Sequence, residues 1–143
     1  MSRMFPRMSQ DAAITLGLAG TSVLHARDEY DAAERWVRVL RLYGVVGSAM
    51  QALGVGEAPI DTAAAEPEAR HKPDTVPGAE EITERSHDMA LHRGAPAVGT
   101  IDILFACLDL YGPAFERALY VRGTSRDELL ERIAYEVERV PLG

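Results

Sequence analysis

The chain has 143 residues, of which 47% are hydrophobic, and its formal net charge is −7 at pH 7. This length suits one domain with a real core, or two small halves packed closely together. Phosphate backbones are bound by clustered Lys and Arg. The acidic balance and the scattered basic residues therefore argue against a nucleic-acid partner.

The cysteine count and the hydropathy pattern indicate a reducing compartment and no membrane contact. Cys107 is the single cysteine, so no disulfide can form within the chain. No apolar run approaches the roughly 20 residues of a membrane span. The opening stretch, MSRMFPRMSQ, lacks the apolar region of a secretory signal. We therefore expect a cytoplasmic protein.

Three helices are expected in the first half of the chain. Ser9 is suited to cap the first one, whose apolar residues recur at helical spacing and which should end near His25. The second is expected over Asp31 to Tyr43 and the third over Gly47 to Leu53, each followed by a glycine that suits a helix end.

The middle of the chain, from Gly56 to Gly78, has the composition of a linker. It contains half of the eight prolines and five acidic residues. A short Ala-rich helical turn over Thr62 to Glu66 is the one element that its sequence suggests.

Four helices are expected after the linker. They are Ala79 to His92, Ile101 to Tyr111, Pro113 to Val121, and a last one capped by Thr124 or Ser125. Glu128 follows Ser125 at the spacing of a capping box. The positions of the first and last of these helices that should face inward are Ile82, Met89, Ala90, Leu129, Leu130, Ile133 and Val137.

Short motifs recur between the two halves in the same order. LH at 24–25 returns at 91–92, LYG at 42–44 returns at 110–112, and AMQALGV at 49–55 is matched by ALYVRGT at 118–124. The offset between the copies is nearly constant, as in a duplicated unit with small loop insertions. We therefore predict an all-α fold in which two pseudo-repeated four-helix modules, about 5–55 and 79–139, pack as one domain.

Several stretches resemble the N-terminal, or Clp repeat, domain of the Clp ATPases, and the resemblance covers nearly the whole chain. They are MFPRMSQDA (4–12), EYDAAERWVRVL (29–40), AVGTIDILFACL (97–108) and the repeat ends ALGV and VRGT. That domain receives substrates and adaptor proteins. The resemblance implies a non-enzymatic protein-binding module, acting as an adaptor, decoy or regulator in Clp-dependent proteolysis. A Walker A motif is absent, so no ATPase module accompanies the domain.

The resemblance also implies where a partner binds. In some family members, the glutamate of a Gly-Thr-Glu-His motif in each repeat holds phosphoarginine. Glu34 matches this glutamate in the first repeat, whereas in the second repeat Ile101 stands at its position and the acid has moved to Asp102. Some members bind cyclic-peptide antibiotics near the N-terminal aromatic. The candidate partner-binding residues are Phe5, Arg7, Met8, Glu34, Arg35, Thr100 and Asp102.

Three functions follow from these residues. A phosphoarginine receptor is weakened by the missing second glutamate and by Ala32 and Ala33, which replace Gly-Thr in the first repeat. A protein that sequesters a cyclic-peptide antibiotic would need an apolar patch around Phe5, Met4 and Met8. A protein or peptide partner, such as a Clp ATPase or its substrates, is the leading hypothesis, and it predicts a partner-binding groove near Phe5, Arg7, Glu34 and Arg35.

Structural roles also account for the individual polar residues. Thr100 fits a helix N-cap, and Asp102 and Glu34 fit first-turn acids that complement the helix dipole. The adjacent Ser86, His87 and Asp88 diverge around a helix, so they predict solvated surface and not a triad.

No constellation in the sequence points to catalysis or to a bound metal. The four histidines lack the spacing of metal ligands, and Cys107 on its apolar helix fits a small buried residue. We therefore expect no enzyme activity, no metal and no cofactor. A small enzyme stays a further possibility, which would need a cleft of convergent polar groups.

Overall fold

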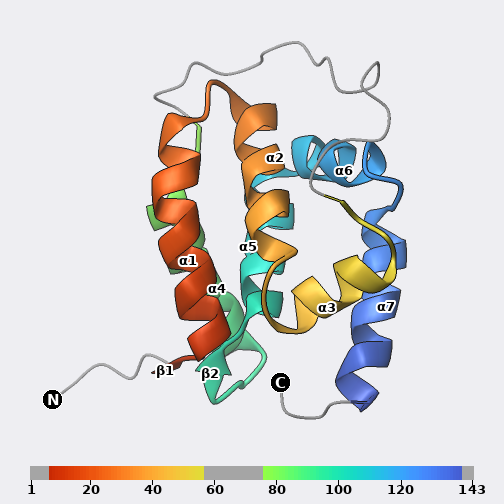
Figure 1. Cartoon of the computed structure of the whole chain (residues 1–143). Coiled ribbons are helices and arrows are strands. Elements are labelled where there is room, and N and C mark those ends of the chain that lie inside the picture. The colour runs from red at the N-terminus through yellow and green to blue at the C-terminus, as the bar shows by residue number, and fades with distance from the viewer. Residues whose placement is uncertain (1–6, 57–75, 140–143) are drawn as a thin grey trace, which may run out of the picture.

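A computed structural model of the protein describes residues 7–56 and 76–139. Within these residues the fold is all-α, with one short pair of strands (Figure 1). A 3-10 turn, η1 (Val23–His25), follows the first helix. The α-helices are α1 (Gln10–Ser22), α2 (Glu29–Leu40), α3 (Gly44–Ala52), α4 (Ala79–His92), α5 (Thr100–Tyr111), α6 (Pro113–Tyr120) and α7 (Arg126–Arg139).

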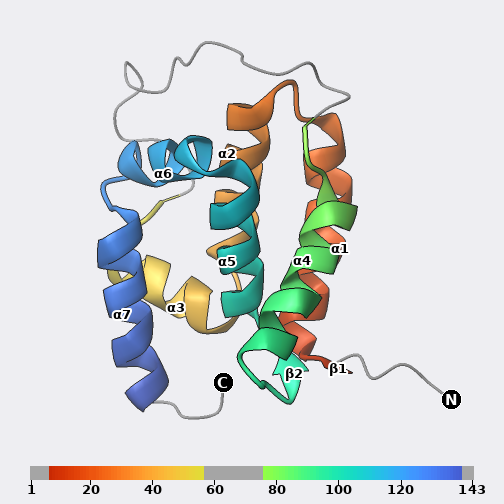
Figure 2. The same ribbon diagram turned by 180° about the vertical axis from the view of Figure 1, so that it is seen from behind.

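The helices α2 and α5 run through the middle of the molecule. The helices α1 and α4 lie on one side of them, and α3, α6 and α7 lie on the other (Figures 1 and 2). The most extensive helix contacts join α4 to α5, α2 to α6 and α3 to α7. Sequence-distant segments therefore share one core.

Two short strands close one end of the molecule. β1 (Arg7–Met8) pairs in parallel with β2 (Ala97–Val98), with Arg7 opposite Ala97. The Ser9 backbone N–H continues the pairing by donating to the Val98 carbonyl at 2.9 Å. This pairing fixes the start of α1 beside the start of α5.

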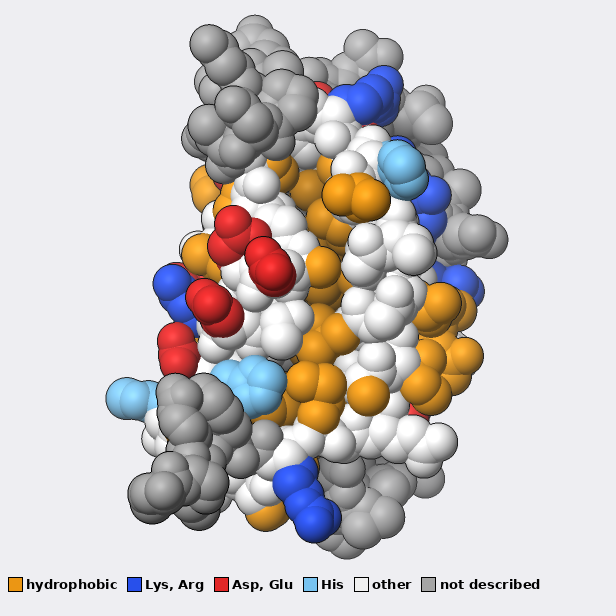
Figure 3. Space-filling view, turned by 90° about the vertical axis from the view of Figure 1, so that its left-hand side faces the viewer, with side chains coloured by type: hydrophobic (Ala, Val, Ile, Leu, Met, Phe, Trp, Pro, Cys, Tyr) orange, Lys and Arg blue, Asp and Glu red, His pale blue; other side chains and the backbone are white. Residues whose placement is uncertain are grey.

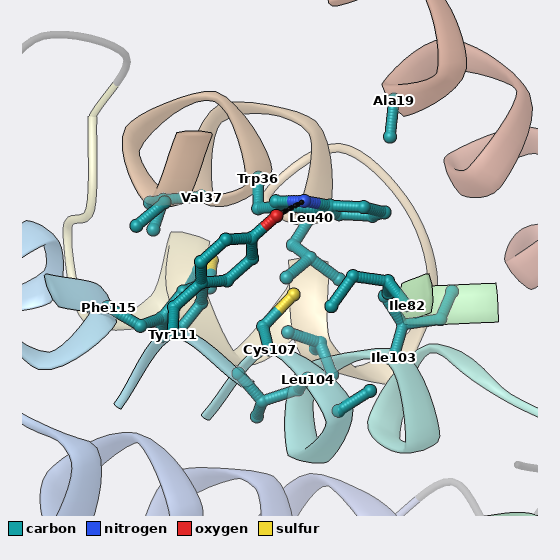
Figure 4. Close-up of a cluster of buried hydrophobic side chains, with 14 of the residues drawn as sticks. Ala19, Trp36, Val37, Leu40, Ile82, Ile103, Leu104, Cys107, Tyr111 and Phe115 are labelled. Carbon is teal, nitrogen blue, oxygen red and sulfur yellow. Dashed lines mark hydrogen bonds between the residues drawn. The ribbon is translucent and has the colours of Figure 1, made fainter. Parts of the chain in front are cut away.

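The centre of the core is built around Trp36, which is fully buried (Figure 4). Its indole N–H donates to the Tyr111 hydroxyl at 3.1 Å, and that hydroxyl donates to the Pro77 carbonyl. These bonds join α2, α5 and the segment that enters α4. Cys107 lies in the same cluster, where burial raises the pKa of its thiol, so its expected role as a small buried residue is confirmed.

The helices of the first half lie where the sequence predicts them, with shifted ends. Ser9 caps α1 by accepting from the Ala12 N–H at 3.1 Å, as expected. The predicted start of α2 is wrong because Asp28 caps the helix, accepting from the Asp31 N–H at 2.8 Å. The chain turns again at Gly44, which begins α3 three residues before the predicted start.

Gly44 is required at this turn for two reasons. Its φ of +75° is disfavoured for residues with a side chain. A Cβ at this position would lie 2.6 Å from Thr100 Oγ1, far inside van der Waals contact. The turn between α2 and α3 therefore packs directly on the first turn of α5.

The second half follows the predictions closely. α4 has the predicted bounds, and α5 and α6 each differ by one residue at one end. Ser125 accepts from the Glu128 N–H at 3.1 Å, which confirms the cap of α7. The prediction that Val137 faces inward is wrong, since it is 38% exposed, and Met89 and Leu130 are only half-buried. α7 lies at the edge of the molecule against α3, so only the side with Leu129 and Ile133 is covered.

The internal repeat stays a prediction. α1, α2 and α3 have 13, 12 and 9 residues, and α4, α5 and α6 have 14, 12 and 8. α7 has no counterpart in the described part of the first half. The turn expected over Thr62 to Glu66 lies outside the described residues.

The side formed by α1 and α4 carries a strip of hydrophobic side chains, with acidic and histidine side chains along one flank (Figure 3). Within residues 7–56 and 76–139, no helix combines the length and the apolar character that crossing a bilayer requires.

Candidate binding groove

The predicted site residues fall into two separate places. Arg7 and Met8 form β1, while Thr100 and Asp102 lie in the first turn of α5, directly after β2. These four residues therefore gather at the strand end of the molecule. Phe5 lies outside the described residues.

Glu34 and Arg35 lie elsewhere, on α2. The Arg35 guanidinium donates to the Ser22 carbonyl at 3.0 Å, at the last residue of α1, whereas β1 precedes the first residue of α1. A helix of this length spans roughly 20 Å. The predicted groove that would unite Arg7 with Glu34 and Arg35 is therefore not formed.

The prediction that Glu34 is a surface acid in the first turn is wrong. It lies in the second turn of α2 and is only 7% exposed. Its carboxylate accepts from the fully buried Arg122 at 2.7 Å and from the Tyr30 hydroxyl at 2.6 Å. Burial, together with the Glu34 carboxylate, raises the pKa of Tyr30. Because Arg122 follows α6, this cluster joins α2 to the second half of the chain.

Asp102 lies in the first turn of α5, as predicted. The prediction that Thr100 caps this helix is wrong. Gly99 is the N-cap, and its N–H donates to the Asp102 carboxylate at 2.9 Å. Arg93 makes two further bonds to Asp102, at 2.7 Å from Nε and 2.9 Å from Nη2. Thr100 is buried, and its Oγ1 accepts from the Val46 N–H at 3.4 Å. A residue after an extended glycine can thus reach α3 instead of its own helix.

Asp31 occupies in α2 the position that Asp102 occupies in α5, the third residue of the helix. Its carboxylate accepts from the Arg27 N–H at 2.9 Å and from the Nε atoms of Arg27 and Arg35 at 3.2 Å. Burial acts to raise its pKa, but these donors outweigh burial and hold the Asp31 pKa below its usual value. By helix position, Asp31 and not Glu34 corresponds to Asp102, and the motif match that assigns Glu34 stays a prediction. Asp28 caps α2 three residues before Asp31, so the N-cap motif is the local sequence signal that places Asp31 in the first turn.

The buried carboxylates of the described residues therefore share one property. Each of Asp31, Glu34 and Asp102 is paired with an arginine of the same chain. A guanidinium group from a ligand would have to displace one of these internal partners.

A groove of about 520 Å³ opens at the strand end of the molecule. Five parts of the chain line it: the start of α1, the start of α3, the connection from α4 to α5, the first turn of α5, and the last turn of α7. Two charged side chains, Asp11 and Arg93, lie in its lining. Its apolar wall is formed by Val45, Ala95, Pro96, Ala97, Ile101 and Val137.

Two of the predicted residues contribute to this groove. Thr100 lines it, and Asp102 lies behind it and holds Arg93 in place. Sequence reasoning missed Asp11, Val45 and Arg93, because tertiary contacts bring their three elements together. The only local signal for Arg93 is its place at the end of α4, where a cation is favoured.

A second hollow, of about 420 Å³, lies on α4 beside Thr83, Glu84, His87 and Asp88. The prediction that Ser86 lies on the solvated surface is wrong, since it is buried and donates to the Ile82 carbonyl at 2.7 Å. His87 Nδ1 lies 3.0 Å from the Thr83 carbonyl oxygen. In the parts of the chain that the structure describes, no group of three or more His, Cys, Asp or Glu could hold a metal ion.

No family model matches this chain, and no curated protein matches it in sequence.

Proposed function

We propose that the protein is a non-enzymatic binding module that receives a peptide segment of a partner protein in the groove at the strand end. The main observation behind this proposal is the groove, which has an apolar wall and two charged side chains in its lining. Binding sites commonly combine an apolar lining with a few polar groups that fix the orientation of the ligand.

The resemblance of MFPRMSQDA and AVGTIDILFACL to Clp repeat domains supports the choice of partner. We propose a cytoplasmic adaptor, decoy or regulator in Clp-dependent proteolysis, bound to a Clp ATPase or to its substrates. Both stretches border the groove, the first through Ser9 and Asp11 and the second through Ala97, Gly99, Thr100 and Ile101.

The internal ion pairs favour a protein segment over phosphoarginine. The two acids offered for a guanidinium, Glu34 and Asp102, already hold Arg122 and Arg93. Breaking the buried pair of Glu34 and Arg122 costs several kcal/mol, which a ligand at Glu34 would have to offset. Met8, proposed for a cyclic-peptide surface, packs partly against the core.

The test is a calorimetric titration of the full chain with the Clp ATPase of the same organism. Ile101→Glu places a charge on the apolar wall of the groove and should weaken binding at least tenfold. Leu24→Glu is the matched control, because Leu24 is 76% exposed on η1 and does not line the groove. The proposal fails if the ATPase does not bind, or if both variants weaken binding equally.

Phosphoarginine is the second titrant. We expect no saturable binding. Binding that disappears in Glu34→Gln or Asp102→Asn, with the fold intact by circular dichroism, would make the protein a receptor for arginine-phosphorylated chains instead.

A further inference from the structure

Arg93 is the one cation in the described lining of the groove, and its guanidinium is held in a fixed orientation. Its Nε and Nη2 atoms donate to the two oxygens of Asp102, which is fully buried and is itself fixed by the Gly99 N–H. A guanidinium has five N–H donors in a planar fork. Two of them point at Asp102, so the others point away from that carboxylate.

The outward donors are accessible, since the Arg93 side chain is 45% exposed. Charge-assisted hydrogen bonds from arginine to a carboxylate are among the stronger polar contacts in proteins. Because Asp102 already orients the guanidinium, little side-chain entropy remains to be lost when a second carboxylate binds.

Two further charges limit what such a ligand can be. Asp11 is the other charged side chain in the lining, and it would repel a second acid. The protein as a whole carries a net charge of −7, so a strongly acidic chain is not attracted over long range. A single carboxylate beside apolar residues fits the groove better than a run of acids.

We propose that the groove recognises a peptide segment through one carboxylate, that of an Asp or Glu side chain. This carboxylate pairs with the outward N–H groups of Arg93, while neighbouring apolar side chains lie on Ala95, Ile101 and Val137. The inference rests on the proposed function, because it names the chemistry of the segment that the groove receives.

The probe is a library of random octapeptides with amidated C-termini, selected for binding to the full chain. The tightest peptide is then synthesised with its acid intact and with that acid replaced by the matching amide. We expect selected peptides to carry one acid next to apolar residues, and the amide form to bind at least tenfold more weakly. Selected peptides without an acid, or an amide form that binds equally well, would overturn the inference.

Arg93→Gln tests the same contact from the side of the protein. It should weaken binding of the acidic peptide at least tenfold and leave binding of the amide peptide unchanged. Arg38→Gln is the control, because Arg38 is an exposed arginine of α2 outside the groove lining. It should leave the binding of both peptides unchanged. Arg93→Gln removes the partner of Asp102 and could prevent folding. In that case, the difference in affinity between the acidic and the amide peptide, measured on the unaltered protein, still tests the inference.

The outcomes separate this inference from the proposed function. Peptides that bind without an acid and are lost in Ile101→Glu would overturn the carboxylate and leave the groove as the binding site. A selection that yields no peptide sensitive to Ile101→Glu would overturn both.

Discussion

Buried charges are the residue-scale feature that distinguishes this protein. Glu34 and Arg122 are paired inside the molecule, and Asp31 and Asp102 each satisfy arginines from the first turn of a helix. Such pairs are not a measure of net stability, because both charges must be desolvated. Removing one partner is costly, however, because the other is left buried and uncompensated.

Arg122→Met should therefore lower the free energy of unfolding by about 3–5 kcal/mol, because Glu34 is left buried without its arginine partner. The measurement is urea unfolding followed by fluorescence. Arg126→Met is the control, since the ion pairs of Arg126 lie at the surface, and it should cost less than about 1 kcal/mol.

The pair is tested further by combining Arg122→Met with Glu34→Gln, which leaves an acceptor for the Tyr30 hydroxyl. We expect the double variant to be more stable than Arg122→Met alone. A double variant whose loss equals the sum of the two single losses would show that the two side chains do not interact.

The lowered pKa of Asp31 predicts how the stability of the protein depends on pH. Its pKa is lowered in the folded protein from an ordinary value of 3.8, so its stabilising contribution is complete at neutral pH and is lost as pH falls through the folded pKa. Asp31→Asn should reduce the loss of stability between about pH 5 and pH 3.

Urea unfolding at a series of pH values measures this slope. Asp127→Asn, at a side chain that is 88% exposed, should leave the slope unchanged. An unchanged slope in Asp31→Asn would contradict the role given to its arginine and backbone donors.

At the scale of elements, side-chain contacts at the helix ends specify most of the helix boundaries. Ser9, Asp28 and Ser125 cap α1, α2 and α7 with side-chain acceptors, whereas Gly99 is the N-cap of α5 and its N–H donates to the Asp102 carboxylate. These contacts decide where the helices begin. The contact of Thr100 with α3 then decides how two of them pack.

Gly44 and Gly54 offer a matched pair of substitutions at this scale. Both have a positive φ, of +75° and +79°, but only Gly44 has a side chain where a Cβ would lie. Gly54→Ala should cost about 1–2 kcal/mol from backbone strain alone. Gly44→Ala should cost clearly more, because Thr100 must also move.

Chemical unfolding of both variants tests the difference. Equal losses would mean that Thr100 yields without cost. In that case, the start of α3 would not be held in place by the first turn of α5.

At the scale of the whole molecule, one hydrophobic core connects the two halves. The buried cluster contains residues of α1, α2 and α3 together with residues of α4, α5, α6 and α7. The bonds from Trp36 to Tyr111 and from Tyr111 to Pro77 cross the same boundary. The two halves therefore do not form separate cores.

We expect the chain to unfold in one cooperative step as a consequence. Trp36 is the single tryptophan and is fully buried, so its emission should shift to longer wavelength as the core opens. The unfolding curve from this emission should coincide with the curve from far-ultraviolet circular dichroism. Separate midpoints would show that the halves unfold independently.

The sequence by itself determined the helical class and most helix positions, because periodicity, caps and glycines are local signals. It placed α4 without error and located Ser9, Pro113 and Ser125 at helix starts. It also placed Cys107 in the core, since its neighbours are apolar.

Only the tertiary structure decided which polar residues are buried and which line the groove. Glu34 and Arg122 are far apart in sequence, and so are Asp11, Val45 and Arg93. The neighbouring sequence of an acidic residue does not show whether its side chain faces water or an arginine that is distant in the sequence. The core packing that joins the two halves settles the choice, because it brings these distant side chains within contact.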